Sequence, residues 1–101
     1  MQLLGFITLK PNEDADSYER WIHDVVHPAA IDLPSISRYD VYRVTGPFRP
    51  GGSVPYQFTE VVTITSLEEV RRDFARPEIA RLLAEFATRA DAIFLVAEQT
   101  S

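Results

Sequence analysis

Both histidines of the 101-residue chain lie in one predicted helix. His23 and His27 follow Glu19 at steps of four residues, so at about 100° per residue the three side chains form a row along one helix shoulder. The row borders an apolar stripe, and we expect it to edge a cleft. Imidazole titrates near neutral pH, so either histidine is a candidate general acid or base. We place His27 ahead of His23 in this role.

Two other interpretations of this row stay open. Glutamate and histidine are metal ligands, but a single helix face holds three of them in a line rather than around a point. No metal-binding motif accompanies them, and we expect no metal. Alternatively, both histidines are half-exposed helix residues, and His27 is favoured by the helix dipole because it lies near the predicted C-terminus of the helix.

Glu60 is the second polar residue at an unexpected position. It alternates with Phe58 and Val62, so it interrupts an otherwise apolar strand face. A carboxylate there must be paired, hydrogen-bonded or raised in pKa, and these are also the ways in which a general base is made. The alternative is a structural salt bridge to Arg43 or Arg38 on the neighbouring strand.

Several aromatic residues are candidates for binding a ligand in such a cleft. The hydroxyls of tyrosines, Tyr42 included, can contact a ligand, although a buried tyrosine more often donates to a backbone carbonyl. No nucleophile elbow, Walker loop or dinucleotide-binding glycine motif is present, and we expect no cofactor. The candidate substrate-binding residues are Tyr18, Trp21, Tyr39, Arg43, Tyr56 and Phe58.

The composition limits the functions that these residues can serve. The chain is 46% hydrophobic, carries a formal net charge of −5 and has no cysteine. It can build a core, and its length suits one domain over residues 1–101. The acidic balance argues against nucleic acid as a partner, and no apolar run is long enough to span a membrane. No signal peptide is visible at the start of the chain, so we expect a cytoplasmic protein.

The predicted elements follow the order β-α-β-β-α-β, with the second helical stretch broken at Pro77. This order is typical of the ferredoxin-like α+β fold, a four-stranded antiparallel sheet with helices on one face. The predicted strands are residues 3–9, 38–45, 56–65 and 92–98, and the predicted helices begin at Asp16, Ser66 and Pro77.

The predicted helix ends depend on a few residues. Asp16 with Glu19, and Ser66 with Glu69, resemble capping boxes that open helices. We expect the first helix to stop near His27 because the residue before a proline is pushed out of the helical region. Residues 46–55 hold three prolines and three glycines and form a loop, either a lid over the cleft or an arm onto a partner subunit.

Several strands are apolar on both faces. Leu3 to Leu9 and Ile93 to Val96 carry hydrophobic residues in both registers, whereas a sheet with one wet face alternates apolar and polar residues. Helices cover only one face, so the other needs a partner. We therefore predict a homodimer that packs sheet against sheet, a dimeric α/β barrel.

The sequence also resembles a known family. ITLKPNEDADSYERWIHDVVHPAA, with Tyr-x2-Trp and a terminal His-Pro, resembles the start of EthD-like members of the dimeric α/β barrel superfamily. LPSISRYDVYRVTG, YQFTEVVTITSLEE and ADAIFLVAEQT are similar to RedY-like (HapK-like) proteins. These proteins occur with prodiginine and other pyrrole or indole natural-product pathways.

The resemblance implies a small-molecule enzyme that binds an aromatic or heteroaromatic intermediate between sheet and helices. It implies His27 as the acid–base residue, with Tyr18 and Trp21 as pocket or core positions. The leading hypothesis is a cofactor-independent cyclase, or a related proton-transfer enzyme, of bacterial secondary metabolism, with His27 and Glu60 moving the proton. The alternatives are a non-catalytic carrier of a pathway intermediate and a cofactor-free monooxygenase.

Overall fold

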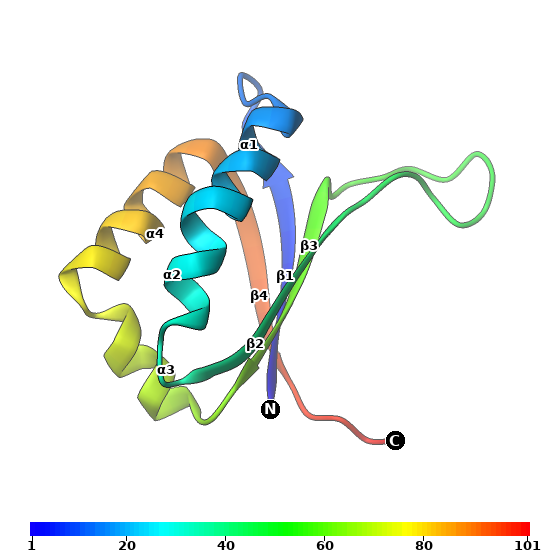
Figure 1. Cartoon of the computed structure of the whole chain (residues 1–101). Coiled ribbons are helices and arrows are strands. Elements are labelled where there is room, and N and C mark those ends of the chain that lie inside the picture. The colour runs from blue at the N-terminus through cyan, green and yellow to red at the C-terminus, as the bar shows by residue number, and fades with distance from the viewer.

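The computed structural model describes residues 1–101 as an antiparallel sheet with all helices on one face (Figure 1). The four strands lie in the order β2-β3-β1-β4, which confirms the predicted ferredoxin-like α+β fold. The strands are β1 (Gln2–Leu9), β2 (Ile36–Arg43), β3 (Phe58–Ile64) and β4 (Ala90–Ala97). The helices are α1 (Ala15–Trp21), the π-helical turn η1 (Ile22–Val26), α2 (His27–Ile31), α3 (Leu67–Phe74) and α4 (Pro77–Arg89).

The strand register decides which side chains face the helices. Glu60 of β3 lies opposite Gly5 of β1 and opposite Val41 of β2. The buried residues of β3 alternate regularly, and Phe58 and Val62 share the face of Glu60. This is the face that packs against the helices, so the predicted break in the apolar pattern of β3 lies inside the protein.

The first helical stretch does not stop at His27 as expected, but continues through Pro28 to Ile31. The backbone N–H of His27 bonds to the carbonyl of Ile22, five residues back, so the turn before the proline is widened. Pro28 then stands in the first turn of α2, where its missing N–H costs little. His27 is therefore not at a helix C-terminus, and the dipole argument for it does not hold.

One of the two predicted caps is displaced. Asp14, not Asp16, caps α1, and its side chain accepts from the N–H of Ser17 at 2.9 Å. Asp16 lies in the first turn and pairs with Arg43 instead, at 2.7 Å. Ser66 caps α3 as predicted, accepting from the N–H of Glu69 at 3.1 Å.

The segment between β2 and β3 forms a long arm. Residues 46–55 have no regular structure and project away from the helices, beyond the uncovered face of the sheet (Figure 1). The alternative of a lid over the chain's own cleft is therefore wrong. Phe48, in this arm, is completely exposed.

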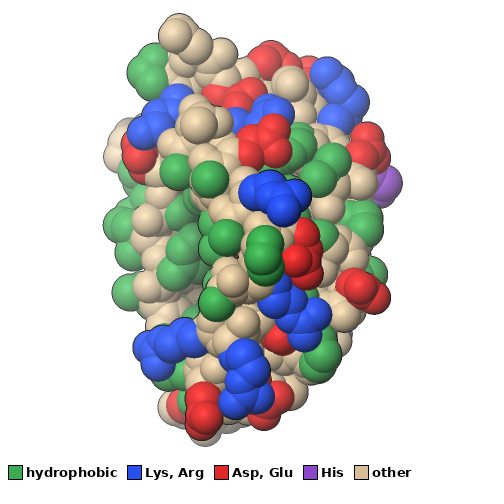
Figure 2. Space-filling view, turned by 90° about the vertical axis from the view of Figure 1, so that its left-hand side faces the viewer, with side chains coloured by type: hydrophobic (Ala, Val, Ile, Leu, Met, Phe, Trp, Pro, Cys, Tyr) green, Lys and Arg blue, Asp and Glu red, His purple; other side chains and the backbone are tan.

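β4 is poorly covered on both faces. Ile93 and Leu95 point to the uncovered face, and Phe94 and Val96 point to the helix side, yet all four are about half exposed. In Figure 2, which looks onto the helical layer, hydrophobic side chains gather at the left-hand margin, toward β4. The apolar surface predicted from the sequence is thus present and concentrated on this edge strand.

Candidate functional site

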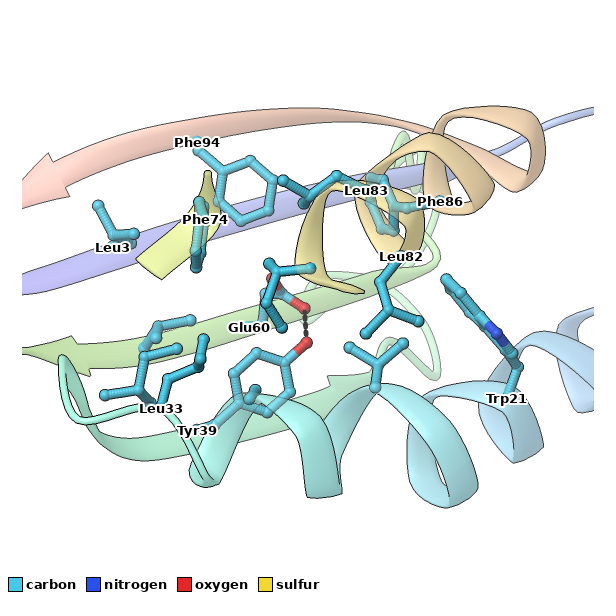
Figure 3. Close-up of a pocket in the computed structure, with 15 residues that line it drawn as sticks. Leu3, Trp21, Leu33, Tyr39, Glu60, Phe74, Leu82, Leu83, Phe86 and Phe94 are labelled. Atoms are coloured by element: carbon cyan, nitrogen blue, oxygen red, sulfur yellow. Dashed lines mark hydrogen bonds between the residues drawn. The ribbon is translucent and has the colours of Figure 1, made fainter. Parts of the chain in front are cut away.

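A cavity of about 300 Å³ lies between the sheet and the helices. Fourteen of its fifteen lining residues are hydrophobic, and the remaining one is Glu60 (Figure 3). The volume is at the lower end of the range of small-molecule sites, which are mostly apolar with a few placed polar groups. The helical walls carry Trp21, Val26, Ala30, Phe74, Ile79, Leu82, Leu83 and Phe86, the strands supply Leu3, Ile36, Tyr39, Val62 and Phe94, and Leu33 lies just before β2.

Glu60 and Tyr39 form the polar centre of this cavity. The Tyr39 hydroxyl donates to Glu60 Oε2 at 2.9 Å, and Glu60 is only 4% exposed. Burial raises the pKa of the Glu60 carboxyl to about 7, although the hydrogen bond from Tyr39 acts in the opposite direction. Burial and the adjacent Glu60 raise the pKa of Tyr39 above its ordinary value, so Tyr39 stays a hydroxyl donor.

Glu60 therefore has both protonation states within reach near neutral pH. With Oε2 occupied by Tyr39, Glu60 Oε1 has no hydrogen-bond partner in the protein. This arrangement suits a group that takes up a proton and returns it.

Gly5 provides the space in which Glu60 lies. A Cβ at this position would come within 2.6 Å of Glu60 Cγ and within 2.7 Å of Phe94 Cε1. Gly5 lies opposite both residues in the sheet, so only a glycine lets them converge over β1. Sequence reasoning missed Gly5 and Phe94 as site residues, although a glycine inside an apolar strand was a usable signal.

Trp21 forms one end of the cavity (Figure 3), and two polar side chains of α4 contact its indole ring. Its indole N–H donates to Glu85 Oε2 at 3.1 Å, and the guanidinium of Arg89 lies 4.6 Å from the indole ring centre. Arg89 also binds Glu85 Oε1 at 3.2 Å and Glu13 at 3.3 Å. These contacts fix the indole between α1 and α4. Glu85 and Arg89 were not identified from the sequence because they belong to a distant helix.

The histidine row lies at a different hollow from the one expected. Glu19, His23 and His27 line a more polar depression of about 360 Å³ beside the edge strand β2. His23 is exposed and pairs with Asp24 at 2.9 Å. The structure contains no group of three or more side chains placed to hold a metal ion. Neither histidine is among the residues that line the apolar cavity with Glu60.

Tyr39 connects the two hollows, because it lines both. His27 Nε2 lies 3.1 Å from the backbone oxygen of Tyr39, and the two rings meet edge to face at 5.6 Å. His27 thus touches the residue that binds Glu60, but not Glu60 itself.

The remaining candidates lie in several places. Arg43 pairs with Asp16, and Arg38 pairs with Asp40 at 2.6 Å, so the predicted salt bridge between Glu60 and either arginine is absent. Tyr18 and Phe58 are buried together, with ring centres 4.8 Å apart, as part of the core beside the cavity. Burial raises the pKa of Tyr18, and its hydroxyl has no hydrogen-bond partner.

Tyr56 was expected to begin the third strand, but it lies outside that strand because β3 begins at Phe58. Its ring packs against Phe6, with ring centres 5.4 Å apart, and Phe6 points to the uncovered face of the sheet. Tyr56 is therefore away from the cavity.

The four-stranded antiparallel sheet with its helices on one face defines an α+β protein of the ferredoxin-like class. The family model described as REDY-like protein HapK matches residues 1–100, and the chain belongs to this family. HapK from Hahella chejuensis is 30% identical, and the match covers 98% of this chain and 92% of that chain with a TM-score of 0.79.

More distant structures share the fold. An EthD family protein from Bacillus halodurans is 13% identical, covering 97% of this chain and 100% of that chain, with a TM-score of 0.68. SnoaB, a cofactor-independent oxygenase from Streptomyces nogalater, is also 13% identical, covering 98% and 93%, with a TM-score of 0.71. No curated protein matches the sequence at a significant level. None of the helices has the length and apolar character that crossing a membrane requires.

Proposed function

We propose that this protein is a cofactor-independent acid–base enzyme that acts on a small aromatic or heteroaromatic molecule bound in the apolar cavity. One observation carries the proposal: a single carboxyl group, Glu60, lies in an otherwise apolar cavity with a pKa of about 7. A carboxyl group in such surroundings is matched to proton transfer at neutral pH.

The catalytic step is a proton transfer through Glu60. The ionised carboxylate, held at Oε2 by Tyr39, takes a proton from an acidic C–H of the ligand through Oε1. The electron pair left on the ligand is delocalised into its conjugated system. The protonated Glu60 then returns the proton to another atom, so the net reaction is an isomerisation or, with a new C–C bond formed in between, a cyclisation. The apolar walls hold the ligand in the reactive conformation.

The cavity lining also restricts the ligand. No Lys, Arg or His lines it, so a carboxylate or phosphate would be buried without a counter-charge. Aromatic side chains at both ends and one acceptor in the middle favour a neutral, flat molecule with an N–H donor, such as a pyrrole or indole. Membership of the HapK family supports a place in bacterial secondary metabolism for such a ligand.

In this proposal His27 is a positioning residue. It bonds to the backbone oxygen of Tyr39, and Tyr39 in turn holds Glu60. Replacing His27 by Ala is therefore expected to lower turnover less than replacing Glu60. His23, which is exposed and faces away from the cavity, has no part in the step.

The test compares Glu60→Gln with the wild-type protein. We expect the wild-type protein to catalyse exchange of the methyl hydrogens of 2-acetylpyrrole in D2O, followed by NMR. The variant should lose about 10²–10⁴-fold of this rate because Gln accepts no proton. Binding of the neutral fluorophore N-phenyl-1-naphthylamine should persist. Glu68→Gln, on the exposed surface of α3, is the matched control.

A carrier function is the second candidate, favoured by the almost completely apolar lining of the cavity. In that case the fluorophore binds, but neither protein accelerates exchange. A cofactor-free monooxygenase would instead consume oxygen with an electron-rich substrate and no added metal or flavin. Either outcome contradicts the proton-transfer proposal.

We also propose that the protein is a homodimer formed through the uncovered face of the sheet. The exposed side chains of Tyr42, Ile93 and Leu95 on that face support this arrangement, since a second sheet would remove them from water.

A further inference from the structure

β4 has exposed hydrophobic residues on both faces, and one partner sheet can bury only one of these faces. A partner sheet packed on the uncovered face would bury Ile93 and Leu95. Phe94 and Val96 point the other way and are 46% and 53% exposed, and the chain's own helices leave them open. We call Leu83, Phe94 and Val96 the β4 rim. Leu83 and Phe94 both line the cavity and are exposed, so the rim is its mouth.

The arm of residues 46–55 carries an apolar side chain that does not pack against its own chain. Phe48 is completely exposed, and the arm's only charged residue is Arg49. The base of the arm is anchored, because Thr8 Oγ1 donates to the carbonyl of Pro55 at 3.0 Å and the N–H of Val44 bonds to Gln57. A firmly based projection with a bare aromatic residue is suited to contact another chain.

The length of the arm matches this purpose. Its five-residue limbs span about 17 Å at roughly 3.3–3.6 Å per residue. Two sheets stack about 10 Å apart, so an arm that leaves on the dimer side passes the plane of the partner's sheet and reaches its helix side. The sheet has two edge strands, β2 and β4, and only β4 exposes hydrophobic side chains on both faces, so β4 is the edge around which a partner's arm can pass.

We propose that the arm of each subunit wraps the β4 edge of its partner and places Phe48 on the partner's β4 rim, closing the mouth of the partner's cavity. Each binding site is then completed by the other chain. Charge is compatible with this pairing: Arg49 follows Phe48, and Glu98, two residues beyond Val96, is exposed and has only a 3.9 Å contact with the N-terminal amino group. The inference rests on the sheet-to-sheet dimer of the proposed function.

Cross-linking tests the contact directly, because the chain has no cysteine. A Phe48→Cys chain is co-expressed with a Val96→Cys chain, and the mixed dimers are treated with a short bismaleimide. We expect a covalent dimer between the two different chains. Replacing the second chain by Glu68→Cys, on exposed α3, is the control and should give no such product.

The outcomes separate the arm from the dimer itself. A dimer in sedimentation that cross-links no better through Val96→Cys than through Glu68→Cys overturns the arm contact and leaves the proposed function intact. A protein that stays monomeric overturns both the arm contact and the proposed dimer.

Ligand binding provides a second measurement that does not depend on the cross-link. Phe48→Ser should weaken binding of N-phenyl-1-naphthylamine about tenfold, since the mouth loses a buried aromatic cover. Val54→Ser in the same arm is the matched control and should bind as the wild-type protein does. Equal affinity of all three proteins contradicts the role of Phe48 as a cap.

Discussion

Glu60 is the proton carrier of the proposed mechanism, and its burial also affects the stability of the protein. Its carboxyl group is buried among apolar side chains and has one hydrogen-bond donor, Tyr39. Burial of the carboxyl opposes ionisation, and the single hydrogen bond offsets only part of that effect. A carboxyl group in this position is costly for folding, and the proposed proton transfer gives that cost a function.

This cost gives a pH-dependent prediction. The pKa of Glu60 is about 7 in the folded protein and about 4.5 when exposed, so the unfolded chain loses this proton first. Stability from this group is therefore present below pH 4.5, falls as the pH rises to 7 and is constant above. In urea unfolding, the free energy of unfolding of Glu60→Gln relative to that of the wild-type protein should rise by about 3 kcal/mol between pH 4.5 and pH 8. A pH-independent difference would contradict the buried, titrating carboxyl.

Trp21 offers an optical test at the same scale, because it is the only tryptophan. Glu85→Ala leaves the indole N–H of Trp21 without its acceptor and removes one of the two carboxylate partners of Arg89, which keeps its pair with Glu13. We expect the emission to shift to longer wavelength and the free energy of unfolding to fall by about 1–3 kcal/mol. Glu68→Ala, which breaks the exposed pair with Arg72, should change the stability by less than about 0.5 kcal/mol and leave the emission unchanged. Identical emission in both variants would show that Glu85 and Arg89 do not hold the indole ring of Trp21.

At the level of elements, the π-turn explains why the first helical stretch is longer than its sequence predicts. A proline ends a helix when the residues before it keep the regular i→i−4 hydrogen-bond pattern of an α-helix. Here the Ile22–Val26 turn shifts the ladder by one residue, and Pro28 occupies a position that needs no donor.

This view can be tested by moving the proline. Pro28→Ala should change the stability by less than about 1 kcal/mol, since no hydrogen bond is lost or required there. Ala84→Pro, at an exposed position inside α4, should cost about 3 kcal/mol or more. Thermal unfolding of both variants measures the difference. A large loss in Pro28→Ala would show that the proline, not the turn, holds α2.

Element order and strand faces were predictable, but the composition of the site was only partly so. The alternation of residue types identified the inward side of β3, because the period of a strand fixes the face of each residue. It also singled out Glu60 as the one polar residue on that side. A helical period gives the angle of His27 around its axis, but not which neighbour lies opposite. Gly5, Glu85 and Phe94 were missed because their roles arise only when distant elements meet. Asp14 and Asp16 are equally good caps by type, and packing chose between them.

At the scale of the whole molecule, the protomer leaves one side of its sheet and both sides of β4 uncovered. Sedimentation at micromolar concentration should therefore give twice the 11.5 kDa chain mass. Leu95→Asp, on the uncovered face of the edge strand β4, should shift the equilibrium toward the monomer, because a charge would be buried against apolar side chains. Thr63→Asp, on the same face of the inner strand β3 but between the polar residues Gln2 and Arg38, is the milder control. A wild-type monomer would refute the sheet-to-sheet arrangement.

The bare edge strand also bears on how the protein is made. A newly synthesised copy that has not yet met another presents an edge strand, which has one free row of backbone groups and hydrophobic residues on both faces and is a template for fibrous or amorphous association. Correct pairing and aggregation therefore compete for the same surface. Thermal tolerance should increase with protein concentration while the native association is reversible, because mass action raises the fraction of paired chains.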